Sequence, residues 1–258
     1  MPCRLLSRPA LLAAMVSSGL VLFSGCSTYL TPGGGSAPWI GAQTDEELRA
    51  AYDRRPAAQF PAHVVAVRIQ QPGYSNARHT AVGEGRFSVM TTREVESAED
   101  LAALGSLTGV AQWGALNRLV LPRHLESLDD LRQGAAQLQA DVLLVYTLDT
   151  SFVVKGAPSG PLQFITLGFI PDKNTYVTTT ASAALLDVRT GYFYGLAEAT
   201  AREDGASSMW KQGELLDRLR VETEGRAFHD LVSEITVLWE GVVAKHATSS
   251  TAHLALPE

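Results

Sequence analysis

A nearly continuous apolar run at residues 142–148 constrains the fold of this chain more than any other feature. The run lies between Asp141 and Asp149, and its lack of alternation is typical of a strand buried on both faces. Before it, Leu125, Leu128, Leu131, Ala135 and Leu138 recur at mostly three- and four-residue steps, which predicts a helix whose first turn accommodates Pro122. A helix that leads directly into a doubly buried strand indicates an α/β layer.

The residues before this unit predict several shorter elements. Thr44 and Glu47 form a capping-box pattern, which predicts a helix that ends near Pro56. We expect a core strand at residues 63–70, a long surface loop at 71–85, a second strand through Phe87 and Val89, a helix at 97–107 and a short extended segment at 116–121.

The second half of the chain predicts an antiparallel hairpin and a closing helix. Residues 175–188 and 192–202 are rich in β-forming residues and are separated by Arg189-Thr190-Gly191. On the second strand, alternation places Glu198 on the same face as Tyr192, Tyr194 and Leu196.

An apolar stripe then predicts the helix, with Glu224, Arg226 and other polar residues on faces away from the sheet. The stripe comprises Phe228, Leu231, Val232, Ile235, Leu238, Trp239 and Val242. The predicted class is therefore α/β (α+β), a mixed sheet with a long antiparallel hairpin and packed helices, including a C-terminal amphipathic helix.

The N-terminal residues have the organisation of a secretory signal. Arg4 and Arg8 precede an uncharged stretch at residues 10–23, followed by Ser24, Gly25 and Cys26. A retained transmembrane anchor is the alternative, but the uncharged stretch is shorter than the roughly 20 residues that a membrane span requires. We expect a signal peptide at 1–25, a flexible tether at 26–42, a single periplasmic α/β domain at 43–246 and a mobile tail at 247–258.

Residues 22–26, Leu-Phe-Ser-Gly-Cys, resemble the lipobox of bacterial lipoproteins. The resemblance implies that the Cys26 thiol carries a diacylglycerol and that Cys26 becomes the first residue after cleavage. Ser27 follows the cysteine where an aspartate would favour the inner membrane in the enterobacterial pattern, so the resemblance implies an outer-membrane location. Cys3 is the only other cysteine and leaves with the signal, which excludes disulfides and thiolate chemistry from the mature chain.

The charge balance argues against nucleic acid as a partner. The chain has 21 Lys and Arg against 27 Asp and Glu, a net charge of −6, and removal of residues 1–25 makes it more acidic. The predicted partners are the membrane, through the N-terminal lipid, and an envelope protein or further copies of the chain.

Catalytic motifs are missing from the sequence. It has no Gly-x-Ser-x-Gly elbow, no His-x-x-x-His pair and no Gly-rich phosphate loop. We predict no catalytic, cofactor-binding or metal-binding residues and no enzymatic activity. The alternative is an enzyme with a dispersed site, for which His63, His124 and Glu198 are the candidates.

Residues 160–171 hold a cluster of apolar side chains between Gly and Pro residues. The cluster predicts a core strand. A partner-binding or membrane-touching hairpin is the alternative, with Phe164, Ile165 and Phe169 as the candidate partner-binding residues.

The order of these elements, together with the Asp187-x-x-Thr190-Gly191 turn, is similar to the periplasmic domain of curli-secretion lipoproteins and the amino-terminal domain of TolB. Residues 138–150 and 178–195 also resemble the rhombotarget lipoproteins. The resemblance implies an envelope location and supplies no catalytic residues. We therefore expect a non-enzymatic binding or assembly module, with an oligomeric ring or channel-like secretion component as the alternative.

Overall fold

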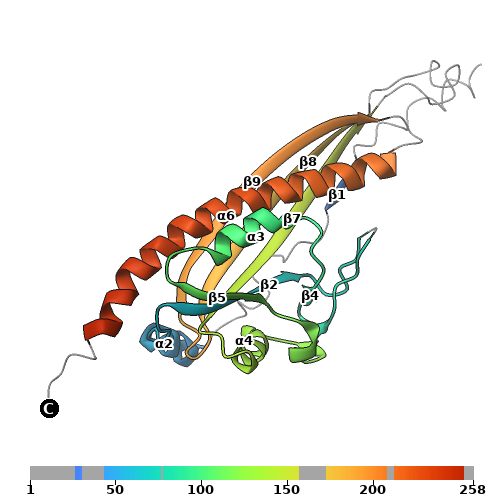
Figure 1. Ribbon diagram of the computed structural model, residues 1–258. Coiled ribbons are helices and arrows are strands. Elements are labelled where there is room, and N and C mark those ends of the chain that lie inside the picture. The colour runs from blue at the N-terminus through green and yellow to red at the C-terminus, as the bar shows by residue number, and fades with distance from the viewer. Residues whose placement is uncertain (1–26, 31–43, 77, 157–172, 208–211, 253–258) are drawn as a thin grey trace, which may run out of the picture.

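A mixed seven-stranded sheet forms the centre of the protein in a computed structural model that describes residues 27–30, 44–76, 78–156, 173–207 and 212–252 (Figure 1). The main strand order is β4-β2-β7-β8-β9, with β5 paired to β2 and β1 paired to β7. These strands are β1 (Ser27–Leu30), β2 (Ala62–Gln70), β4 (Ser88–Met90), β5 (Val110–Ala115), β7 (Val142–Gly156), β8 (Lys173–Asp187) and β9 (Phe193–Ser207). The remaining elements are α2 (Asp45–Asp53), β3 (Glu84–Gly85), α3 (Ala98–Gly105), η1 (Arg118–Val120), β6 (His124–Leu125), α4 (Leu128–Gln137) and α6 (Gln212–Ala252). The predicted α+β class, with its hairpin and its C-terminal helix, is confirmed.

The first part of β7 is the doubly buried strand that its apolar run predicts. It lies between β2, which is parallel to it, and β8, which is antiparallel. On one face, Leu144 and Leu148 pack in a cluster with residues of α3 and α6; on the other face, Leu143 and Val145 pack with Leu131 of α4. Helices therefore cover both faces of this part of the sheet, which we call the body.

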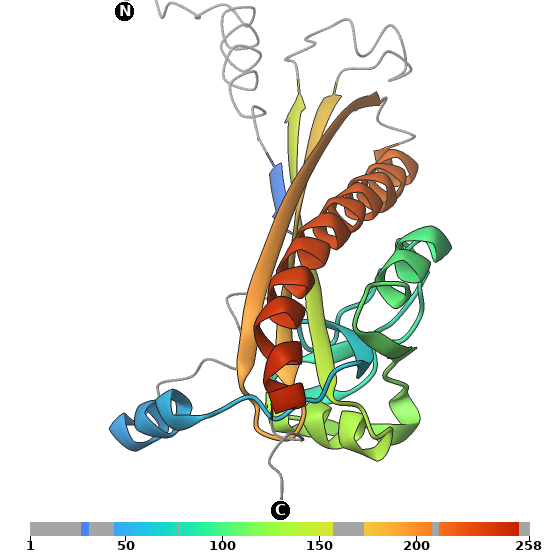
Figure 2. The same ribbon diagram turned by 60° about the vertical axis from the view of Figure 1, so that its left-hand side comes forward.

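The second part of β7 extends beyond the body together with β8 and β9. Gly156 pairs with Lys173 and Lys173 pairs with Ser207, so the three strands end at the same level. β1 pairs with β7 near this level, Ser27 opposite Val154. We call this end of the sheet the distal end. Figures 1 and 2 show it on the opposite side of the molecule from α2 and α4.

Small residues on β9 let α6 approach the sheet closely. A Cβ at Gly195 would lie 2.5 Å from a methyl carbon of Leu238, and one at Gly205 would lie 3.2 Å from methyl carbons of Leu215 and Leu219. Between these glycines, Ala197, Ala199 and Ala201 belong to the cluster under α6. Since larger side chains would hold the helix away, the composition of β9 determines the separation of helix and sheet.

Secondary structure extends into two of the segments that the sequence predicts to flank the domain. The tether predicted at 26–42 includes β1. Residues 27–30 pair with β7 beyond the point where its pairing with β2 ends. The tail predicted from residue 247 continues α6 as far as Ala252. The other residues of the tether and the tail, and the signal peptide, lie outside the described residues.

The middle of the chain also differs from the prediction. The segment expected to be extended at 116–121 contains the 3₁₀ helix η1. The strand lies earlier, as β5, and none of its residues is buried, so its sequence lacks a clear apolar–polar alternation. The helix expected to start after Pro122 begins at Leu128, because Ser127 and Asp130 form a capping box there. The predicted loop at 71–85 contains β3, which pairs with β6.

A β-bulge in β9 overturns the predicted face of Glu198. Leu185 pairs with Gly195 but Leu186 pairs with Phe193, so Tyr194 is one extra residue. Tyr194 packs against the cluster under α6, whereas Leu196 is 72% exposed on the opposite face. Glu198 therefore shares its face with Leu196 and not with Tyr194.

The turn between β8 and β9 is held by Asp187, whose side chain is buried. Its Oδ2 accepts hydrogen bonds from the backbone N–H groups of Ala57 and Ala58 at 2.6 and 2.7 Å and from the Tyr194 hydroxyl at 2.9 Å. Its Oδ1 accepts from the N–H groups of Arg189 and Thr190. Although burial opposes the charge, these hydrogen bonds lower the pKa of Asp187. The carboxylate thus joins the segment after α2 to the hairpin.

We expect Asp187→Asn to lower the free energy of unfolding by about 1–3 kcal/mol at pH 7, because the amide NH₂ would face donors. The folded-state pKa is depressed, so the stabilisation is present above the unfolded pKa of about 3.9 and is lost as the pH falls through the folded value. Urea denaturation at several pH values should therefore show the difference between variant and parent shrink at acidic pH. Asp129→Asn, at an exposed carboxylate of α4, is the control. A difference that stays constant from pH 7 to strong acid would contradict this role.

Candidate functional site

The predicted lipidation and partner-binding residues, Cys26, Phe164, Ile165 and Phe169, lie outside the described residues. The strands next to them are described. Cys26 immediately precedes Ser27, which pairs with Val154. The segment that holds the three apolar residues leaves the sheet at Gly156 and re-enters it at Lys173, which pair with each other. Both predicted sites are therefore attached to the distal end of the sheet.

A small apolar cluster holds α6 to this end. Phe152 of β7 and Val177 of β8 are buried against Leu215 and Leu219 of α6. The beginning of α6 is thereby fixed to the extension of the sheet, so β1, the strand ends and this helix end form one structural unit (Figure 1).

The three candidates for a dispersed catalytic site are not brought together. In the described part of the chain no hydrogen bond or ion pair joins them. His63 Nδ1 lies 3.3 Å from the backbone oxygen of Gln139, and His124 lies on the surface 3.7 Å from Glu84. Glu198 on β9 accepts from the hydroxyl of Ser182 on β8. Nor does any group of three His, Cys, Asp or Glu side chains suited to a metal ion occur among the described residues.

Charged residues that the sequence did not single out form a buried ion cluster between the sheet and α6. Arg68 of β2, only 2% exposed, lies 3.2 Å from Glu224 and 3.5 Å from Glu96. Arg220 also contacts Glu224, at 3.1 Å. The buried ion cluster comprises Arg68, Glu94, Glu96, Asp217, Arg220 and Glu224.

Neutral side chains complete the hydrogen bonding of this cluster. Tyr146 donates to Glu96 at 2.9 Å and Thr150 donates to Glu224 at 3.0 Å. Burial opposes the charge of Arg68, but Glu224 and Glu96 hold its pKa above the ordinary value. Burial and the neighbouring Glu96 raise the pKa of Tyr146 well above its usual range. Both side chains therefore keep their protons at physiological pH.

The position of Glu224 corrects the prediction that it faces away from the sheet. It is 1% exposed and receives hydrogen bonds from β2, β7 and its own helix. Charged residues are rarely buried unless they are paired, so hydropathy alone assigns such a glutamate to solvent. The signal that could have identified the cluster is Arg68, a charge inside an otherwise apolar strand.

The space beside this cluster is small. A cavity of about 40 Å³ is lined by Arg68, Glu96 and Tyr146 among others, which suits one or two waters. Each carboxylate of the cluster lies within 4 Å of an arginine. The arrangement thus fixes the register of α6 on the sheet.

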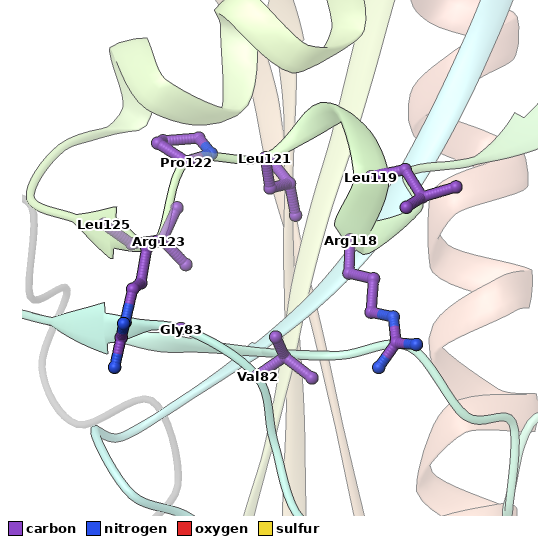
Figure 3. A pocket seen from close by; sticks show the side chains of 8 residues that line it. All are labelled: Val82, Gly83, Arg118, Leu119, Leu121, Pro122, Arg123 and Leu125. Carbon is purple, nitrogen blue, oxygen red and sulfur yellow. The ribbon is translucent and has the colours of Figure 1, made fainter.

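A larger, open pocket lies at the edge of the body, with a volume of about 330 Å³ (Figure 3). Its walls are mostly apolar, and Leu119 of η1 is 87% exposed beside it. Arg123 at its rim is paired with Glu84 at 2.8 Å, whereas Arg118 makes no ion pair with any described residue. Val82, Gly83, Leu121, Pro122 and Leu125 complete the lining.

Among the described residues, no helix is both long enough and apolar enough to span a bilayer.

No family model matches this sequence, and no curated protein matches it. Among solved structures, the chain is similar to a protein of Caulobacter crescentus CB15 that is described provisionally as a lipoprotein. The two are 13% identical, the match covers 41% of this chain and 70% of that one, and the TM-score is 0.26. A likeness at that level carries no argument about the function of this chain.

Proposed function

We propose that this chain is a lipoprotein, anchored through Cys26 to the periplasmic face of the outer membrane, that acts without catalysis as a binding or assembly module for envelope proteins. The lipobox-like residues 22–26 support the anchor, and the position of β1 supports a defined orientation. Because Ser27 is already part of the sheet, a lipid on Cys26 would hold the distal end close to the headgroups.

This attachment differs from the flexible tether expected from the sequence. Sixteen flexible residues would span about 22 Å and leave the domain free to turn. With β1 paired to β7, an anchor at Cys26 would turn the distal end toward the bilayer. It would turn α2 and α4, which lie at the opposite end of the molecule (Figure 2), toward the periplasm. Those surfaces are then available to partner proteins.

An oligomeric ring or channel-like secretion component is the second candidate. The observation in its favour is β9, a 15-residue strand at the edge of the sheet. The resemblance to rhombotarget and curli-secretion lipoproteins remains a prediction under either candidate.

Metabolic labelling with radioactive palmitate tests the proposal. The chain should incorporate the label and should sediment with the outer membrane in a density gradient. An unlabelled chain in the soluble periplasmic fraction would contradict the anchor, and steady hydrolytic turnover by the purified chain would contradict a non-enzymatic role.

A further inference from the structure

The open pocket of Figure 3 adjoins the end of the molecule that the proposed anchor turns away from the bilayer. Its wall packs on α4: a Cβ at Gly134 would lie 2.9 Å from the backbone oxygen of Val120 and 3.1 Å from a methyl carbon of Leu121. Figures 1 and 2 show α4 on the opposite side of the molecule from the distal end. A protein in the periplasm therefore reaches the pocket without contacting the membrane.

Leu119 is exposed at this pocket because the fold holds it there. Its backbone N–H donates to Asn117 Oδ1 at 3.1 Å, and the N–H of Leu121 donates to the backbone oxygen of Arg118. These hydrogen bonds close η1, which α4 supports from behind. Leu119 is 87% exposed and Val82, in the same lining, is 37% exposed. Apolar side chains on a fixed turn lose little conformational freedom when a partner covers them.

Arg118 gives the pocket a cation without a partner. Its side chain makes neither an ion pair nor a hydrogen bond within the described part of the chain, and the described lining contains no aspartate or glutamate. Arg123, on the opposite side of the pocket in Figure 3, donates from Nε and Nη2 to Glu84 Oε1 at 3.1 and 2.8 Å. Because Arg123 compensates the charge of Glu84, Arg118 is left for a carboxylate from outside the chain.

These features fit one kind of ligand. A guanidinium binds a carboxylate through paired hydrogen bonds, and apolar walls bind an apolar side chain. The volume of about 330 Å³ is near the lower end of the usual range for ligand pockets. An open pocket of that size accommodates one or two side chains of a peptide that continues across the surface. Since the chain has a net charge of −6, Arg118 is a local site at which an acidic partner is attracted.

We propose that this pocket binds a segment of an envelope protein in which an apolar side chain stands beside an aspartate or glutamate. The apolar side chain packs against Val82, Leu119 and Leu121, and the carboxylate accepts hydrogen bonds from Arg118. This inference rests on the binding role proposed above and names the chemistry of the partner. It does not depend on the lipid, so loss of palmitate labelling and loss of peptide binding are separate results.

Fluorescence anisotropy with labelled peptides tests the site on the full acylated chain in detergent. The probe is Gly-Ser-Asp-Leu-Phe-Glu-Ser-Gly. One control peptide has lysine in place of both acidic residues, and the other has serine in place of Leu-Phe. We expect the probe to bind about tenfold more tightly than either control, and its affinity to fall as salt is added. Absence of saturable binding, or equal binding of the probe and the lysine peptide, would overturn the proposal.

Three variants locate the binding. Arg118→Glu should weaken the probe by about tenfold or more and should strengthen the lysine peptide, because the charge at the pocket is reversed. Leu119→Ser should weaken the probe without changing urea denaturation, because the side chain is 87% exposed. Arg49→Glu, at an exposed arginine of α2, is the matched control and should change neither peptide. If it acts like Arg118→Glu, net charge alone governs binding and the pocket is not the site.

A lipid with a phosphate group is the competing ligand, since it also combines an anion with apolar groups. Dihexanoyl phosphatidylglycerol, added below its micelle-forming concentration, should not displace the probe from the parent chain. Displacement that Arg118→Glu abolishes would assign the pocket to a lipid and would overturn the proposal.

Discussion

Arg68→Met is expected to lower the free energy of unfolding by about 3–5 kcal/mol, the usual cost of removing one partner from a buried ion pair. The guanidinium lies between Glu96 and Glu224 with almost no exposed surface. Methionine fills similar space but leaves both glutamates without this cation. Arg220 would remain on Glu224, so the larger part of the penalty should arise at Glu96. Urea denaturation followed by fluorescence measures the loss.

Two further variants separate charge from packing. Arg123→Met removes a cation from an ion pair with Glu84 whose side chains are 81% and 52% exposed, and such pairs contribute about 0–1 kcal/mol. Adding Glu96→Gln to Arg68→Met should restore part of the lost stability, because the uncompensated carboxylate is removed. If Arg68→Met costs no more than Arg123→Met, the cluster does not fix α6 to the sheet.

Cys26→Ser is expected to move the chain from the membrane to the soluble periplasmic fraction. The anchor proposed here is the lipid on Cys26, and stable anchoring by lipid needs at least two chains. A serine at position 26 cannot carry the thioether-linked diacylglycerol, so the variant should lose both its palmitate label and its membrane association. Ultracentrifugation after a high-salt wash measures the distribution.

Cys3→Ser is the matched control, since Cys3 precedes the expected cleavage site and should leave with the signal. That variant should remain in the membrane pellet like the parent. A Cys26→Ser chain that also remains in the pellet would show that some other part of the molecule holds it there.

The sequence predicts an element correctly where the pattern of nearby residues matches the burial and hydrogen bonding of those residues in the fold. The apolar run of β7, the capping box of α2 and the turn between β8 and β9 are all found where their patterns place them. In each case the pattern reflects contacts close in the chain or burial on both faces, and both can be read from residue order.

The sequence failed where distant residues determine the structure. Thr223 and Glu224 interrupt the apolar stripe of α6, so the helix was expected to pack only from Phe228 onward. Both are in fact buried. Arg68 and Thr150 donate hydrogen bonds to Glu224, and the Thr223 hydroxyl donates to the backbone oxygen of Leu219. The stripe therefore includes Leu215 and Leu219. The bulge at Tyr194 and the pairing of β1 with β7 likewise depend on partners far away in the chain.

Energy transfer to a labelled bilayer measures the orientation of the sheet at the membrane most directly. A donor is attached through Asp204→Cys near the distal end, or through Leu48→Cys on α2, in acylated chain bound to vesicles with acceptor-labelled headgroups. Acylation of Cys26 leaves only the introduced thiol to label. We predict clearly more efficient transfer from position 204 than from position 48. Equal transfer from the two positions, or more from position 48, would contradict the orientation.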